Sequence, residues 1–245
     1  MKSLEPVIEI NDLRKGFGTQ EVLKDVSLKL FKGENLAVLG KSGSGKSVLI
    51  KCIVGLFNPD FGTINVLGEN VSQLSNDNLG ELRKKIGFLF QSGALYDSMN
   101  VRQNLEFPLK RIKKDLTQKE INEKVNEALE NVGLADAIDK MPSQLSGGMR
   151  KRISLARTIV VDPMIILYDE PTTGLDPATS DEISSLINDV QKKYKTSSLI
   201  ITHDIECVRN TANRLIMLND GVVYKVGELA EFEKSSDSLI RSFFK

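Results

Sequence analysis

The sequence predicts an α/β fold with a mainly parallel core sheet, an antiparallel β flank at the N-terminus and a helical insert. From residue 36 onward, apolar runs typical of buried strands alternate with segments of helical periodicity. Residues 7–31 hold short alternating apolar runs, which are typical of antiparallel strands. Residues 92–160 read as mainly helical. We expect one domain over residues 1–245, with the helical insert at about 92–160.

Composition narrows the class of protein. The chain has 245 residues, of which 40% are hydrophobic, and it carries 33 basic and 33 acidic residues. A net charge of zero argues against a general nucleic-acid binder. The two cysteines lie in apolar segments and fit a reduced compartment better than a disulfide scaffold. No apolar run reaches the length of a membrane span, and residues 1–6 lack the apolar stretch of a signal peptide. We therefore expect another subunit to hold the protein at any membrane where it works.

The individual elements follow from apolar runs and turn residues. Strands are predicted at residues 7–10, 26–30, 36–39, 63–67, 86–90, 165–168 and 198–201. Turns are predicted at residues 15–18 and 58–62. Helices are predicted directly after residue 47 and at residues 118–132, 149–160 and 179–194. The tail, residues 228–245, combines both charge signs with apolar side chains, so we expect it to pack on the body of the protein.

A glycine-rich loop connects the strand at 36–39 to the helix after it. The loop fits the pattern G-x-x-x-x-G-K-[ST], in which backbone N–H groups surround a phosphate at a helix N-terminus. Lys46 would reach the β- and γ-phosphates, and the Ser47 hydroxyl would hold Mg²⁺. The loop therefore predicts binding of ATP or GTP. The expected nucleotide-contacting residues are Gly40, Lys41, Ser42, Gly43, Ser44, Gly45, Lys46 and Ser47.

Two carboxylates, Asp169 and Glu170, directly follow the buried strand at 165–168. Ligands of open α/β sheets bind beyond the carboxyl ends of the strands. Asp169 is placed there to hold Mg²⁺, often through water, and Glu170 to orient or deprotonate an attacking water. The alternative is a pair of solvated acids at a strand end. Lys46 and Ser47 upstream favour the functional interpretation.

Three more motifs lie where sheet loops converge or where a helix begins. Leu145-Ser146-Gly147-Gly148-Met149 precedes the helix at 149–160 and is either a second anion site or a plain helix cap. His203 is the only histidine, and its place after the strand at 198–201 favours a hydrogen bond to a γ-phosphate over a structural role. Gln91 follows the strand at 86–90, where it can touch Mg²⁺ or the attacking water.

In this order, the motifs resemble those of the nucleotide-binding subunits of ABC transporters over essentially the whole chain. The resemblance implies the P-loop NTPase fold of ABC ATPases, with a helical signature subdomain and ATP as the nucleotide. Residues 40–47 match the P-loop, Gln91 the glutamine loop, and residues 145–149 the signature. Residues 165–170 match the Walker B strand, residues 174–176 the D-loop, and His203 the switch histidine.

The same resemblance implies a mechanism. Two copies pair head to tail, and Ser146 and Gly148 of one copy bind the γ-phosphate held by the P-loop of the other. Phe17 resembles the aromatic residue that stacks on adenine, although a core position is the alternative. The implied catalytic residues are Lys46, Gln91, Glu170 and His203. The implied metal ligands are Ser47, Gln91 and Asp169. Gly147 and Asp176 complete the implied nucleotide contacts.

The segment at 88–101, with Asn-Leu-Glu-Phe-Pro-Leu at 104–109, closely resembles the Mla/Mkl group. These are the ATPases of bacterial MCE-associated lipid transporters. Met149, where most signatures carry glutamine, and residues 141–143 resemble that group too. The resemblance implies phospholipid transport between membranes, driven from the cytoplasmic side of the bacterial inner membrane. The implied partners are an integral-membrane permease and an MCE-type lipid-binding protein.

Several alternatives stay open at this point. The chain ends soon after Phe244, whereas some relatives carry a longer extension, so the binding of a small regulatory subunit is undecided. Met149 either faces a partner or packs. An ABC-type regulator of cell division and another lipid or lipoprotein system are alternative functions. A soluble ATPase of DNA repair or translation is disfavoured by zero net charge, a single P-loop and the lack of coiled-coil heptads.

Overall fold

The computed structural model describes residues 5–244, so most of the segment 1–6 and the last residue of the tail lie outside it. The first sheet is antiparallel, with strand order β2-β1-β4-β5. Its strands are β1 (Pro6–Phe17), β2 (Gln20–Phe31), β4 (Phe61–Val66) and β5 (Glu69–Asn70). The predicted N-terminal antiparallel flank is confirmed. The turn predicted at 15–18 is wrong in place, because residues 15–17 still pair with β2 and the chain reverses at Gly18 and Thr19.

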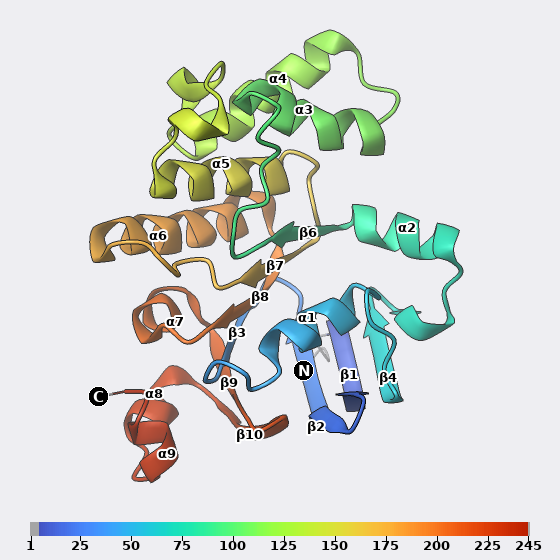
Figure 1. The fold of residues 1–245 in the computed structure, drawn as a ribbon, viewed down its shortest axis with the longest axis vertical. Helices are drawn as coiled ribbons and strands as arrows, with labels where there is room; N and C mark the ends of the chain where they lie inside the picture. The colour runs from blue at the N-terminus through green and yellow to red at the C-terminus, as the bar shows by residue number, and fades with distance from the viewer. Residues whose placement is uncertain (1–4, 245) are drawn as a thin grey trace.

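The second sheet forms the centre of the molecule, with strand order β10-β9-β3-β8-β7-β6 (Figure 1). Its strands are β3 (Asn35–Leu39), β6 (Ile86–Leu89), β7 (Ile165–Asp169), β8 (Ser197–Thr202), β9 (Arg214–Asn219) and β10 (Val222–Gly227). All neighbours pair in parallel except β9 and β10. The predicted mainly parallel core sheet is therefore confirmed.

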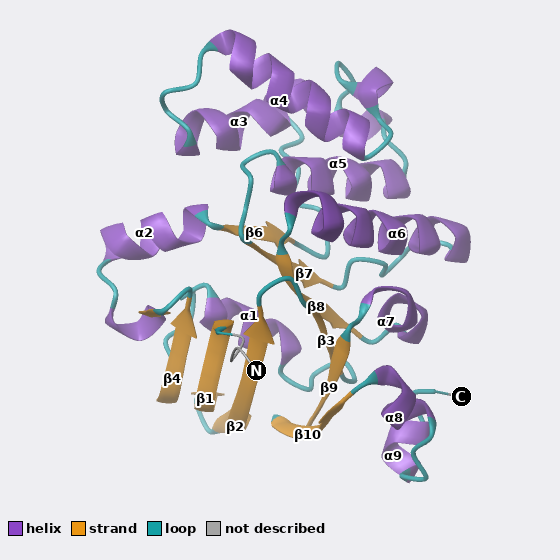
Figure 2. Cartoon of the chain, turned by 180° about the vertical axis from the view of Figure 1, so that it is seen from behind, coloured by secondary structure: helices purple, strands orange, loops and turns teal. Residues whose placement is uncertain are grey.

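Helices cover both faces of the central sheet, as Figure 2 shows from behind. Helix α1 (Lys46–Ile53) packs between the two sheets, and its buried side chains share one core with Ile10, Val38 and Leu167. On the opposite face, α5 (Gly147–Ile159) and α6 (Pro177–Tyr194) pack on Ile166, Tyr168 and Ile200. The strands alternate their side chains between the two cores, which is why continuous apolar runs are needed there.

The remaining helices lie around this frame. They are α2 (Asn76–Lys84), α3 (Val101–Ile112), α4 (Gln118–Asn131), α7 (Ile205–Thr211), α8 (Leu229–Glu233) and α9 (Ser238–Arg241), with 3₁₀ turns at Val71–Gln73, Ala135–Ala137 and Pro142–Gln144. Helices α3 and α4 share the core of α5 and α6. Phe232 and Ile240 of the tail are buried against β9, as expected. Among the described residues, no helix has both the length and the apolarity to cross a bilayer.

The predicted helices are found, with shifted starts. Helix α5 begins at Gly147 rather than 149, because Ser146 caps it and both signature glycines enter its first turn. Helix α6 begins at Pro177, because Asp176 is its cap. The sequence patterns did not predict α2, α7 or the hairpin β9–β10, and they placed α3 only within the helical insert at about 92–160. The Asp220-Gly221 pair between two apolar runs is a strong hairpin signal and could have revealed the hairpin.

Candidate active site

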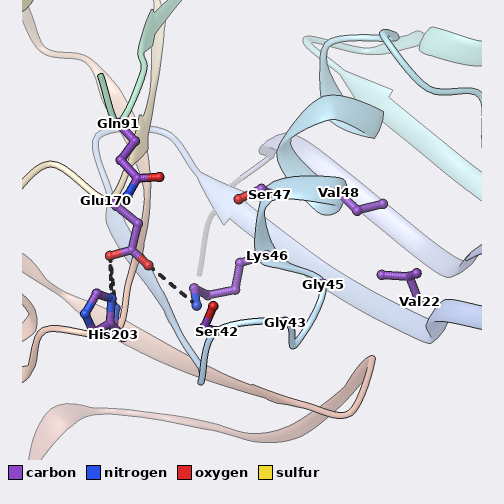
Figure 3. Close-up of a pocket in the computed structure, with 10 residues that line it drawn as sticks. All are labelled: Val22, Ser42, Gly43, Gly45, Lys46, Ser47, Val48, Gln91, Glu170 and His203. Carbon is purple, nitrogen blue, oxygen red and sulfur yellow. Dashed lines mark hydrogen bonds and ion pairs between the residues drawn. The ribbon is translucent and has the colours of Figure 1, made fainter. Parts of the chain in front are cut away.

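A pocket of about 330 Å³ opens beside the glycine-rich loop, where β6, β7 and β8 end (Figure 3). The strands carry their terminal residues to this edge because they run in parallel. The pocket is lined by Val22, Ser42, Gly43, Gly45, Lys46, Ser47, Val48, Gln91, Glu170 and His203. The structure thus brings residues from four separate motifs to one place. Of the lining residues, only Val22 and Val48 were not among the predicted site residues.

The backbone of the glycine-rich loop has the shape that its sequence predicts. Gly43 and Gly45 have φ angles of +83° and +101°, which favour glycine. A Cβ on Gly40 would lie 2.5 Å from the carbonyl oxygen of Leu218. Helix α1 starts directly behind the loop, and Gly45 gives it no side-chain cap, so its first N–H groups can bind an anion. Within residues 5–244, the buried Ser44 hydroxyl has no hydrogen-bond partner.

Lys46 occupies the centre of the loop. Its Nζ donates to the carbonyl oxygens of Gly40, at 2.6 Å, and Lys41, at 3.1 Å. The same atom lies 3.6 Å from Oε1 of Glu170. Burial lowers the pKa of Lys46, and the Glu170 carboxylate opposes that shift. The ammonium is therefore held between the loop and the carboxylate, where phosphate oxygens would compete for it.

Glu170 and His203 face each other across the ends of β7 and β8. Nδ1 of His203 lies 2.8 Å from Oε2 of Glu170, and that oxygen also accepts from the Thr173 hydroxyl at 3.1 Å. The backbone of Glu170 is left-handed, with φ +52°, which is uncommon for a residue with a side chain. Since Nδ1 is engaged, Nε2 is the ring nitrogen that remains for a phosphate, and 57% of the His203 side chain is exposed.

The predicted metal ligands also lie near the pocket. The Ser47 hydroxyl donates to Oδ1 of Asp169 at 3.4 Å, and Gln91 extends along the pocket wall (Figure 3). Burial and the neighbouring Glu170 carboxylate raise the pKa of Asp169. A divalent cation would relieve that repulsion, and hydroxyl, carboxylate and amide oxygens are the ligands that Mg²⁺ prefers. These residues therefore fit Mg²⁺, which would neutralise phosphate charge at this point.

The remaining predicted residues do not line this pocket. Ser146 caps α5 by accepting from the N–H of Met149, at 3.2 Å. Asp176 caps α6 by accepting from the N–H of Thr179, at 3.0 Å. A Cβ on Gly148 would lie 2.5 Å from Cγ2 of Thr179, so the starts of the two helices touch. Within one copy, Ser146, Gly147, Gly148 and Asp176 form a second cluster of helix starts.

The packing of two side chains bears on alternatives that the sequence left open. Met149 is partly buried against the core of α5 and α6, and the rest of the residue stays accessible in a single copy. Phe17 does not line the pocket. Its ring meets Phe57 edge-on at 5.2 Å between centroids, yet 45% of the residue stays exposed. It is therefore not a core residue, and its exposed ring is free to contact a base.

Two side chains on α5 that were not among the predicted site residues contact the segments around the pocket. Lys151 is buried, and its Nζ donates to the carbonyl oxygen of Glu170 at 3.2 Å. Nη1 of Arg157 donates to the carbonyl oxygen of Ala94 at 2.6 Å, and its guanidinium lies 4.9 Å from the centroid of the Tyr96 ring. Arg157 thus holds the segment that follows Gln91. A basic residue on the apolar face of a helix was the available signal.

Comparison with known proteins is consistent with this geometry. The profile of the ABC transporter family matches residues 23–173. The methionine import ATP-binding protein MetN of Brucella abortus is 38% identical over 222 residues, which cover 91% of this chain and 60% of that protein. Mkl of Mycobacterium tuberculosis, named as a ribonucleotide transport ATP-binding protein, is 40% identical over 236 residues. That match covers 96% of this chain and 66% of Mkl. The chain thus spans less than two thirds of both relatives.

Two solved structures match this chain over almost the whole length of the solved protein. The ATP-binding cassette MJ0796, in a dimeric post-hydrolysis state with ADP and Pi, has a TM-score of 0.83 and 31% identity. The match covers 91% of this chain and 98% of that one. CbiO1 of Clostridium perfringens, part of an ABC transporter complex, has a TM-score of 0.86 and 29% identity, with coverage of 97% and 94%. The chain belongs to the ABC transporter family and has the fold of its ATP-binding cassettes.

Proposed function

We propose that the chain binds and hydrolyses ATP and thereby drives a transporter. The observation that carries this proposal is the meeting of Lys46, Glu170 and His203 in one pocket, with Ser47 and Asp169 beside it. Lys46 would exchange its loop carbonyls for the β- and γ-phosphate oxygens. Ser47, Asp169 and Gln91 would hold Mg²⁺. Phe17 would stack on the adenine.

Glu170 is the proposed general base. Its Oε2 lies at the carboxyl edge of the sheet and is oriented by Thr173 and His203. A water between this oxygen and the γ-phosphorus would lose its proton to Glu170 as the P–O bond forms, and ADP would leave on the far side. With a proton on each ring nitrogen, His203 would donate from Nδ1 to Glu170 and from Nε2 to the γ-phosphate, and so align the phosphate with the water.

A second copy of the chain is needed to complete the site. Ser146, Gly147, Gly148 and Asp176 lie outside the pocket that holds Lys46, so in one copy no signature residue is placed on the phosphate. We infer that two copies pair head to tail, with Ser146 and Gly148 of one facing the γ-phosphate bound by the other. The dimeric state of MJ0796 supports this arrangement.

Phospholipid is the proposed transported substrate, with an integral-membrane permease and an MCE-type lipid-binding protein as partners. The support is the resemblance of residues 88–101 and Met149 to the Mla/Mkl group, together with the 40% identity to Mkl. The protein would then sit on the cytoplasmic side of a bacterial inner membrane, bound through the permease. The names of MetN and Mkl indicate two other solutes to test, methionine and a ribonucleotide.

Two experiments test the parts of this proposal separately. First, the purified chain should hydrolyse ATP with Mg²⁺, and the activity should rise with the square of protein concentration where dimers are scarce. An inactive wild-type protein, or a linear dependence at concentrations where gel filtration with ATP shows mostly monomer, would contradict the head-to-tail ATPase. Second, the chain should be reconstituted with the permease whose gene lies beside its own. This complex should hydrolyse ATP faster with phospholipid than without it. Stimulation by methionine or a ribonucleotide instead would overturn the lipid assignment.

A further inference from the structure

Lys151 is a buried cation on the signature helix. It lies in the second turn of α5, five residues after the cap Ser146, and only 6% of the residue is exposed. Its Nζ donates to the backbone carbonyl oxygen of Glu170 at 3.2 Å. Among residues 5–244, no carboxylate oxygen lies within the 4.0 Å of an ion pair with it. The ammonium is thus directed at a backbone atom rather than at a counter-ion.

This arrangement is unfavourable as plain packing. An ammonium that leaves water for one neutral acceptor loses hydration energy that a single hydrogen bond does not restore. Accordingly, burial lowers the pKa of Lys151 to about 8, although the Asp169 and Glu170 charges oppose the shift. A methionine would fill the same space without that cost. The hydrogen bond from Lys151 to the carbonyl oxygen of Glu170 therefore explains the buried lysine better than its contribution to core packing does.

The acceptor is at a point of the backbone that needs holding. Glu170 is the first residue after β7, and its φ of +52° lies in a region that side chains disfavour. Its N–H donates to the carbonyl oxygen of Ile201 at 2.9 Å, on β8. Its carbonyl oxygen accepts from Lys151 and, at 3.4 Å, from the N–H of Thr173. Lys151 thus ties the peptide of Glu170 to α5.

We propose that Lys151 is a positioning residue that fixes the Glu170 backbone to the signature helix and so couples the two nucleotides of a dimer. The proposal rests on the proposed function. In the head-to-tail pair, Ser146 at the start of α5 would contact one nucleotide, while Glu170 of the same chain would act on the other. One rigid helix joins these two points. Engagement of the signature at one site would then orient the base at the other.

The test compares Lys151→Met, which keeps an unbranched side chain but lacks the ammonium, with Lys151→Arg, which keeps the charge and hydrogen-bond donors. Lys119→Met is the matched control, since that lysine side chain is 87% exposed on α4. We would measure kcat, KM and the Hill coefficient for ATP hydrolysis, the Kd for a fluorescent ATP analogue, and thermal unfolding. Wild type and Glu170→Gln are run alongside.

For Lys151→Met we expect kcat to fall about tenfold, because Glu170 is no longer held by α5 in the orientation that the transition state requires. The nucleotide Kd should stay within about twofold, and the Hill coefficient should fall toward 1 because the sites are uncoupled. The unfolding temperature should be unchanged or higher, since a buried charge is removed. Lys151→Arg should restore most of kcat, and Lys119→Met should behave as wild type.

Three results would overturn the inference. If Lys151→Met keeps wild-type kcat and Hill coefficient while Glu170→Gln is inactive, the ATPase proposal stands and Lys151 has no positioning role. If kcat falls without a change in cooperativity, the coupling is wrong. If Lys151→Met and a second variant, Lys151→Gln, both unfold at lower temperature and Lys151→Arg restores nothing, the role is structural. An inactive wild type, by contrast, identifies a failure of the proposed function itself.

Discussion

Oε2 of Glu170 accepts hydrogen bonds from the Thr173 hydroxyl, at 3.1 Å, and from the backbone N–H of His203, at 3.3 Å. The carboxylate is therefore held from its own loop and from the neighbouring strand. Its second oxygen, Oε1, lies 3.6 Å from Nζ of Lys46. Both oxygens of the Glu170 carboxylate therefore have partners before any substrate binds. A substitution that keeps the size of this side chain but removes its basicity should lower the rate of ATP hydrolysis and leave ATP binding intact.

Glu170→Gln is the first such change. The amide keeps the size of the side chain and can still accept from Thr173, but it cannot take a proton from water. We expect kcat to fall by about 10²- to 10⁴-fold, the usual contribution of a general base. ATP should still bind, and gel filtration with ATP should show a stable dimer. Glu123→Gln, at an exposed position of α4, is the control. Unchanged turnover would remove Glu170 from the base role.

His203→Ala should lower kcat with little loss of ATP affinity, because in the proposed mechanism the ring would contact only one phosphate and orient Glu170. In a double-mutant cycle with Glu170→Gln, the two effects should be far less than additive, since each disrupts the same contact. Isothermal titration gives the affinity, and phosphate release gives the rate. A collapse of affinity with normal turnover per bound ATP would show that His203 serves binding instead.

Gly40→Ala tests the shape of the loop. The added Cβ would lie 2.5 Å from a backbone oxygen, that of Leu218, which cannot swing away. The loop must shift, and an overpacked site typically costs about 1–3 kcal/mol, so ATP affinity should fall by about tenfold or more. Gly80→Ala in α2 meets no atom within 4 Å and is the matched control, expected to stabilise the fold slightly. Equal affinities for the two variants would contradict the prediction.

A pH series of unfolding experiments examines Lys151. Its pKa is about 8 in the folded protein against 10.5 for the free side chain. Between these values the unfolded chain binds a proton that the folded protein lacks, so the free energy of unfolding contributed by this group rises with pH. Denaturant unfolding should be measured from pH 7 to pH 10. Above about pH 8, the free energy of unfolding of wild type should rise relative to that of Lys151→Met. Curves that stay parallel over this range would contradict the depressed pKa.

Sequence patterns predicted the parts of the fold that depend on local periodicity. The strands β3, β7 and β8 are buried on both faces, and this burial requires the continuous apolar runs that identify them. Helices α2 and α7 are short and half-exposed, so their apolar faces are too brief to stand out. The first turn was predicted too early because Gly16 is a residue type typical of turns. In the structure Gly16 is still part of β1, and its N–H donates to the Asp60 carboxylate.

The same limit explains what was and was not predictable in the site. Lys46, Ser47, Glu170 and His203 lie in short motifs whose residue types reveal their chemistry, although Glu170 contacts Lys46 and His203 across 124 and 33 residues of sequence. Lys151 and Arg157 act on carbonyl oxygens that lie 19 and 63 residues away along the chain. A backbone carbonyl carries no residue identity. The basic residues on the apolar face of α5 could therefore be noticed in the sequence, but the carbonyl oxygens that they contact could not be predicted from it.

Helix α1 carries the P-loop at one end and is part of the core between the two sheets along its length. Nucleotide binding and folding are therefore linked through one element. A ligand that orders the start of α1 should raise the melting temperature of the entire chain, by an amount that grows with the logarithm of its concentration above Kd. Conversely, Cys52 is a buried residue of α1 in the core between the two sheets. A substitution there that destabilises this core should also weaken nucleotide binding. Thermal stability thus provides a readout of nucleotide occupancy that needs neither a permease nor a membrane.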